Sequence, residues 1–258
     1  MSVTYASYLM IDALLDLQRP LSEGPEHDEQ LFIIIHQVYE LWFKQVLHEV
    51  GYLHKALEGN NTPVALHTFK RILTILKTMV SQVDVLETMT PMSFTSFRTR
   101  LESSSGFQSA QFRELEFALG HRRPAMLAHH PEGSVTRARL EARLAAPSLY
   151  DAFLSLLRLN GLPVPAQAAP AGAPLEPSLE VQAILIQVYK TNPTLTQICE
   201  RLVDLDEGIQ EWRYRHVKMV ERTIGTRQGT GGSAGADYLK STLFRPLFPD
   251  LWAIRASL

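Results

Sequence analysis

The chain has 258 residues, 45% hydrophobic and 20% charged, a balance that excludes disorder for most of it. Its formal net charge of −2 offers no attraction to a polyanion, which argues against nucleic acid or an anionic membrane as the partner. The single cysteine, Cys199, cannot form an internal disulfide, and no secretory signal begins the chain. No apolar run approaches the ~20 residues of a membrane span, so we expect a cytoplasmic protein that binds a small molecule.

Helical spacing of apolar residues runs along almost the whole sequence, and strand-like alternation is hard to find. The fold class is therefore predicted to be all-α. An apolar stripe predicts one long helix over residues 28–57. The pairs Thr62–Pro63 and Thr90–Pro91 predict the next two helix starts, with threonine as the N-cap and proline at the first helical position.

The remaining elements are predicted as shorter helices, a linker and a second long helix. A proline- and alanine-rich stretch over residues 162–177 cannot sustain a helix, and we interpret it as a linker inside a single domain spanning residues 1–258. The other segments are helices over 109–120, 135–145, 148–160, 179–190 and 193–224, a glycine-rich loop over 225–236 and a short helical tail.

One histidine lies on the predicted core-facing stripe of the second long helix. This stripe advances in alternating steps of three and four, through Leu202, Leu205, Ile209, Trp212, His216, Met219 and Thr223. A buried imidazole must satisfy both ring nitrogens, so His216 is either a core histidine bonded to a nearby oxygen or a metal ligand. Spacing alone favours the core histidine.

The chain lacks the clustered ligands of a non-haem metal site. Neither the Glu-x-x-His pairs of di-iron bundles nor a His-Glu-x-x-His motif occurs. Haem needs less from a protein, because the porphyrin supplies four ligands and the chain only an axial one. Since the sequence has no Cys-x-x-Cys-His motif, any haem is expected to be held non-covalently.

Other candidate side chains lie beside aromatic residues or glycine-rich turns. His36 follows Phe32 by one helical turn, and on spacing alone it too is interpreted as structural. The turn over residues 103–109 is flanked by Arg98, Arg100 and Arg113. An arginine facing inward would suit bidentate binding of a substrate carboxylate, although each one taken singly is better explained as a solvated charge.

The glycine-rich loop over residues 225–235 matches neither a P-loop nor a Rossmann motif. Its glycines suit a lid over a pocket as well as a plain flexible connection. Thr230 is its most useful polar group.

Taken together, five blocks of the chain closely resemble the tryptophan 2,3-dioxygenase family in their order, their spacing and their amino acids. They are HDEQLFIIIHQVYELWFKQVLHE (27–49), VLETMTPMSFTSFR (85–98), SSGFQSAQFRELEFALG (104–120), WRYRHVKMVERTIG (212–225) and GTGGSAG (229–235). The resemblance covers most of the chain, and such a set of motifs is highly specific.

The resemblance implies non-covalent haem b, one per subunit and active as Fe(II), with His216 as the axial ligand of the iron. It implies that His36 is the distal histidine, which hydrogen-bonds the indole N–H of the substrate. Arg98 is then expected to bind the substrate carboxylate, Thr230 the substrate ammonium, and Phe32 the indole ring.

The same resemblance also implies roles for several further residues. Phe94 occupies a substrate-binding position where some members have tyrosine, so we expect activity to survive without that hydroxyl. Ser105 and Gly106 match the segment that lines the oxygen side of the haem. An N-terminal helix is expected to complete the pocket of a neighbouring subunit in a homotetramer, a dimer of dimers, through Tyr5, Tyr8 and Leu9.

The implied reaction is cleavage of the indole C2–C3 bond of L-tryptophan by O2, which yields N-formyl-L-kynurenine. This is the first step of the kynurenine pathway of tryptophan catabolism. Two alternatives stay open at this point. A related haem monooxygenase would form an oxindole from tryptophan or a substituted indole. A non-enzymatic helical binding protein would show no haem chemistry.

Overall fold

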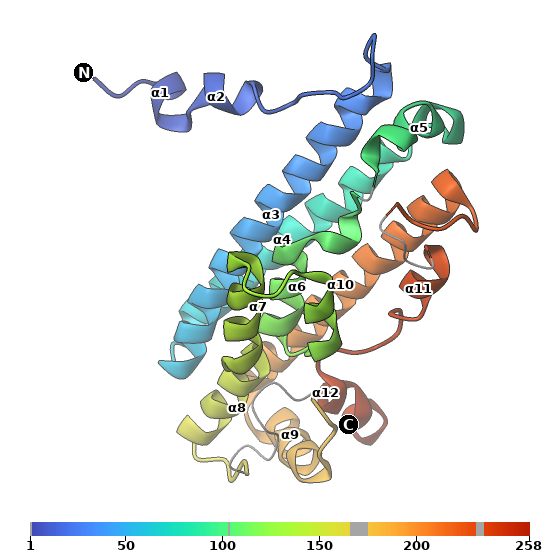
Figure 1. The fold of residues 1–258 in the computed structure, drawn as a ribbon. Coiled ribbons are helices and arrows are strands. Elements are labelled where there is room, and N and C mark those ends of the chain that lie inside the picture. The colour runs from blue at the N-terminus through green and yellow to red at the C-terminus, as the bar shows by residue number, and fades with distance from the viewer. Residues whose placement is uncertain (1, 103, 166–174, 231–234) are drawn as a thin grey trace.

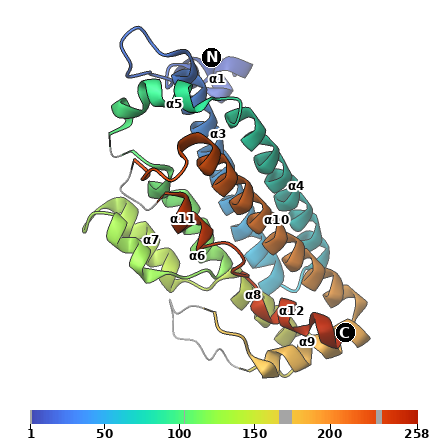
Figure 2. The same ribbon diagram turned by 90° about the vertical axis from the view of Figure 1, so that its right-hand side faces the viewer.

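Three long helices form the body of the protein. In the computed structural model, which describes residues 2–102, 104–165, 175–230 and 235–258, every regular element is a helix. The long ones are α3 (His27–Glu58), α4 (Thr62–Leu86) and α10 (Pro193–Ile224), which lie side by side in both views (Figures 1 and 2). This confirms the all-α prediction for the described ranges.

Shorter helices surround this body. In chain order they are α1 (Tyr5–Leu9), α2 (Ile11–Leu15), α5 (Pro91–Arg98), η1 (Thr99–Leu101), η2 (Gly106–Gln108), α6 (Ala110–Leu119), η3 (Pro124–His129), α7 (Val135–Ala145), α8 (Leu149–Leu159), α9 (Leu179–Thr191), α11 (Ala236–Lys240), α12 (Pro249–Ala253) and η4 (Ile254–Ser257). α6 and α8 pack on α3, and α5 contacts both α3 and α10. No helix in the described ranges is long and apolar enough to cross a membrane.

Side-chain caps define most of the helix starts. Thr90 caps α5 by accepting a hydrogen bond from the Ser93 backbone N–H at 3.1 Å, as predicted. The expected cap at Thr62 is wrong by one residue. Asn61 caps α4 instead, accepting from the Val64 backbone N–H at 3.3 Å, because asparagine caps as well as threonine and Pro63 is tolerated anywhere in the first turn.

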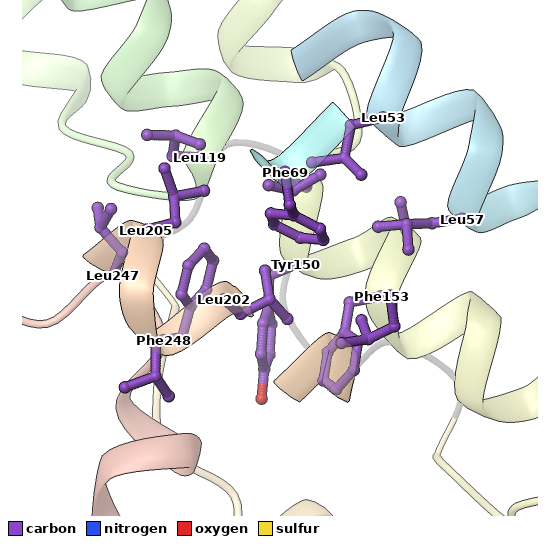
Figure 3. Close-up of a cluster of buried hydrophobic side chains, with 14 of the residues drawn as sticks. Leu53, Leu57, Phe69, Leu119, Tyr150, Phe153, Leu202, Leu205, Leu247 and Phe248 are labelled. Atoms are coloured by element: carbon purple, nitrogen blue, oxygen red, sulfur yellow. The ribbon is translucent and has the colours of Figure 1, made fainter. Parts of the chain in front are cut away.

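The main hydrophobic core fills the end of the bundle farthest from α5. Figure 3 shows the side chains that meet there, among them Leu53, Leu57, Phe69, Leu119, Tyr150, Phe153, Leu202, Leu205, Leu247 and Phe248. The C-terminal segment is fixed to α10 by the buried Asp206 carboxylate, which accepts hydrogen bonds from the Leu247 N–H at 2.7 Å and the Trp252 indole at 2.9 Å. This end is a rigid base for α10.

The predicted linker lies only partly within the described residues, since residues 166–174 are outside them. Its first residues have no helix, as predicted, yet Val164 is buried in the core. The Arg158 guanidinium donates to the Pro165 carbonyl at 3.0 Å. The start of the linker is therefore packed against the bundle.

The N-terminal arm, comprising α1 and α2, extends away from the bundle (Figure 1). It is attached to α3 at Gln37, whose side-chain amide donates to the Leu17 carbonyl at 3.1 Å, and at the buried Glu29 carboxylate, which accepts hydrogen bonds from the backbone N–H groups of Leu21 at 2.7 Å and Ser22 at 3.1 Å. Burial acts to raise the pKa of Glu29, but these bonds hold it below its ordinary value. Tyr5 and Tyr8 remain 78% and 76% exposed, and Leu9 43%.

Candidate active site

The C-terminal half of α10 presents His216 beside a second aromatic ring. Trp212, one turn earlier, stacks on the imidazole with ring centroids 5.4 Å apart and planes at 9°. Burial lowers the pKa of His216 to about 4, and nearby His36 lowers it further, so the ring is neutral at pH 7. Within the described residues neither ring nitrogen has a hydrogen-bond partner, which leaves His216 able to act as a ligand.

His36 approaches the same space from α3. Its Nδ1 donates to the Phe32 carbonyl oxygen at 2.7 Å; because that oxygen can only accept, the proton of the neutral ring lies on Nδ1. Burial lowers the pKa of His36, although the Phe32 carbonyl and the Glu40 carboxylate oppose this. Nε2 is therefore a free lone pair that can accept a hydrogen bond from a ligand.

An apolar wall adjoins the His36 ring. Phe32 lies 4.1 Å from the imidazole, centroid to centroid, and 5.8 Å from Phe94. Phe97 closes the group at 5.5 Å from both phenylalanines. Phe94 is 8% exposed and Phe97 fully buried, so the wall is preformed by α3 and α5. An indole ring suits such a surface.

The last residue of α5, Arg98, reaches the segment that follows α10. Its guanidinium donates to the Gln228 carbonyl at 2.5 Å, and in the described ranges it pairs with no carboxylate. The buried Arg113, by contrast, pairs with Glu116, and Arg100 is exposed. Of the three arginines flanking this turn, Arg98 alone combines partial burial with an available charge.

A second contact joins the same two segments. The Thr230 hydroxyl donates to the Ser104 carbonyl, so its oxygen retains only acceptor capacity. Ser105 caps η2 by accepting from the Phe107 N–H at 3.3 Å, and a Cβ added at Gly106 would meet no atom within 4 Å. The rest of the GTGGSAG block, residues 231–234, lies outside the described residues.

Comparison with known proteins identifies the family. The family model described as tryptophan 2,3-dioxygenase matches residues 1–132 and 178–258. The chain belongs to the tryptophan 2,3-dioxygenase family. It is 61% identical to the tryptophan 2,3-dioxygenase of Herpetosiphon aurantiacus, over 100% of this chain and 99% of that protein. Identity is 60% to the Anaeromyxobacter sp. (strain K) protein of that name, covering 100% and 97%, and 45% to that of Caulobacter vibrioides, covering 99% and 98%.

The residues of this family member fit haem better than a metal held by protein ligands alone. No three histidine, cysteine or acidic side chains of the described part gather closely enough to bind an ion together. His216 is a neutral imidazole with no protein hydrogen bond in the described ranges, and His36, a second neutral imidazole from another helix, lies near enough to lower its pKa; such a pair suits one axial ligand and one distal group. The individual roles of these side chains stay predictions.

Sequence reasoning missed a buried ion cluster that connects α6 to α10. Glu116 accepts from Arg213 at 2.7 Å and from Arg123 at 3.0 Å, and it also pairs with Arg113. Burial acts to raise the pKa of Glu116, but the three guanidinium groups hold it below its ordinary value. Arg213 lies next to Trp212 in sequence, so the cluster anchors the helix that carries His216. The available signal was an arginine and a carboxylate three residues apart on α6, Arg113 and Glu116.

His121 beside this cluster is expected to destabilise the protein in acid. Burial, together with Arg213, Arg123 and Arg113, lowers its pKa from 6.5 to about 4 against the opposing effect of Glu116. At acidic pH the unfolded chain therefore binds a proton at His121 that the folded chain does not bind. The stability that neutral His121 contributes is complete above pH 6.5 and is lost as the pH falls to about 4.

Urea unfolding at about pH 7.5 and about pH 4.5 measures this loss. The His121→Gln variant should lose less unfolding free energy over this interval than the wild type, by on the order of 1–3 kcal/mol. His48→Gln, at an exposed histidine of α3, is the control and should behave as wild type. Equal acid sensitivity of wild type and His121→Gln would contradict the assignment.

Proposed function

We propose that this chain is a haem-dependent dioxygenase that cleaves the indole C2–C3 bond of L-tryptophan with O2 and releases N-formyl-L-kynurenine. This is the first step of the kynurenine pathway of tryptophan catabolism. The observation that carries the proposal is the neutral His216 imidazole, which has no protein hydrogen bond within the described residues and whose pKa His36 lowers, in a member of the tryptophan 2,3-dioxygenase family. His216 would hold non-covalent haem b, one per subunit.

Haem, active as Fe(II), supplies the O2 chemistry that no protein side chain provides. The protein's task is to bind tryptophan, orient it and exclude water. The Nε2 lone pair of His36 accepts a hydrogen bond from the indole N–H, and Phe32 and Phe94 pack against the ring. Because a neutral imidazole is too weak a base to remove the indole proton readily, we assign His36 to positioning.

The amino-acid end of the substrate is recognised by charge. Arg98, which has no acidic partner in the described ranges, binds the carboxylate through its planar fork of N–H donors. The Thr230 hydroxyl donates its hydrogen bond to the Ser104 carbonyl, so its oxygen accepts from the substrate ammonium. Ser105 and Gly106 line the oxygen side, where the missing Cβ leaves open space.

The assembly is proposed to be a homotetramer in the cytoplasm, with neither nucleic acid nor membrane as partner. Large apolar side chains exposed on a projecting arm support packing on another subunit. Tyr5, Tyr8 and Leu9 are the residues proposed to complete the neighbouring pocket.

Replacing His36 with alanine should leave an active enzyme that binds tryptophan more weakly. One lost hydrogen bond raises KM roughly 2- to 12-fold, with a smaller change in kcat. Steady-state kinetics with L-tryptophan and 1-methyl-L-tryptophan test whether the lost hydrogen bond is the cause. The analogue lacks the indole N–H, so the substitution should raise its KM less. Complete loss of turnover with O2 binding intact would instead make His36 essential to the chemistry.

The reaction itself is tested by reducing the haem-loaded protein without oxygen, adding L-tryptophan and then labelled O2. Following the Soret band together with product mass tests cofactor and reaction at once. Both labelled atoms in N-formylkynurenine support the proposal. An oxindole carrying a single labelled atom would favour the monooxygenase alternative. Absence of haem absorption, even with added haemin, would favour a non-enzymatic binding protein.

A further inference from the structure

The orientation of the His216 imidazole is set by its neighbours in the protein. A ligating histidine almost always donates its second ring N–H to a carboxylate, a carbonyl or water, which fixes the orientation of the ring. Within the described residues no protein group makes such a bond to His216. Its one close aromatic neighbour in these ranges is Trp212, stacked almost parallel at 9°.

Trp212 is itself held on several sides. It is 8% exposed, and its ring lies 5.0 Å from Phe112 of α6 and 5.8 Å from Phe43 of α3, centroid to centroid. Tyr39 contacts it edge-on at 6.2 Å, and the Tyr39 hydroxyl donates to the Met79 carbonyl at 2.7 Å. Rings from two other helices therefore prevent the indole from turning.

The backbone beside Trp212 is equally restrained. The adjacent Arg213 side chain is 4% exposed and donates to Glu116 of α6 at 2.7 Å. A charge-assisted bond between buried groups fixes the rotation of α10 about its axis at this turn. The plane of the Trp212 indole is thus held by the rings packed against it and by the fixed rotation of α10. The His216 ring can align against this plane.

We propose that Trp212 is a positioning residue that sets the plane of the His216 imidazole by stacking, in the role that a hydrogen bond to the ring fills elsewhere. The proposal rests on the proposed function, in which His216 is the axial ligand.

Three variants of the haem-loaded enzyme test the proposal. Trp212→Phe retains an aromatic plane, Trp212→Leu removes it, and Phe69→Leu removes a fully buried aromatic ring from the main core on α4. The readouts are the rate of haem transfer to an excess of apomyoglobin and the iron–histidine stretching band of the ferrous protein. Trp212→Met is a fourth variant, a longer and more flexible non-aromatic replacement, and it decides the question if the leucine variant does not fold.

The expected result separates aromatic from non-aromatic residues. Trp212→Leu and Trp212→Met should speed haem loss about 3- to 10-fold, the range that one aromatic pair is worth, and should shift or broaden the iron–histidine band. Trp212→Phe should stay close to wild type in both. Phe69→Leu should leave the band unchanged.

Two results would overturn the inference. An unchanged band in the non-aromatic variants would show that stacking does not orient the ligand. The same shift in Phe69→Leu would reduce the role of Trp212 to core packing. Failure of the proposed function looks different, since wild-type protein would then show no iron–histidine band at all.

Discussion

Replacing His216 with alanine is expected to abolish indole cleavage while leaving the helical fold intact. Activity should fall at least about 10³-fold, because His216 is the proposed axial ligand of the haem that supplies the O2 chemistry. The fold should survive because alanine favours the helix and no protein hydrogen bond of this ring is lost within the described residues. Formation of N-formylkynurenine, haem content and the helical circular dichroism signal measure the three parts of this prediction.

His48→Ala, at an exposed histidine of α3, is the matched control and should retain full activity. Added imidazole provides a sharper test, since it can enter the space left by the side chain and ligate the iron. Partial recovery of haem binding with imidazole would support axial ligation by His216. Full activity of His216→Ala without added imidazole would refute it.

Replacing Arg98 with alanine is expected to lower kcat/KM for L-tryptophan about 30- to 150-fold, mainly through KM. This range corresponds to a charge-assisted hydrogen bond of about 2–3 kcal/mol. The kcat/KM of Arg98→Lys should fall between those of the wild type and Arg98→Ala, because lysine keeps the charge but lacks the planar fork. Steady-state kinetics with L-tryptophan measure the effect, and Arg100→Ala at the exposed neighbour should resemble wild type.

Arg98 also donates to the Gln228 carbonyl, so its loss could act through the segment after α10. Tryptamine separates the two effects because it lacks the carboxylate. If Arg98 binds the carboxylate, Arg98→Ala should leave the affinity for tryptamine within about 3-fold of wild type. Equal losses for tryptophan and tryptamine would assign Arg98 to holding the loop. An unchanged kcat/KM for tryptophan would exclude the carboxylate contact.

Local sequence determined the helices of this protein and most of their ends. The long apolar stripes of α3 and α10, and the caps at Thr90 and Ser109, depend on residues within one or two turns of each other. The α4 cap was predicted at Thr62 but lies at Asn61, because two neighbouring residues can both serve as N-caps. The same local pattern placed Trp212 and His216 on one stripe, and the structure adds that their rings stack.

Only the tertiary structure decided which partners these side chains meet. Periodicity could not show that His36 of α3 lies near enough to His216 of α10 to lower its pKa, or that Arg113 is paired with Glu116 while Arg98 has no acidic partner in the described ranges. Each of these choices depends on how separate helices pack, and helical spacing reports only which face of one helix turns inward. The sequence by itself therefore determined the helices, their faces and, through its resemblance to a family, the expected chemistry. Packing between helices determined that, within the described residues, the His216 imidazole meets no protein hydrogen-bond partner and Arg98 meets no carboxylate.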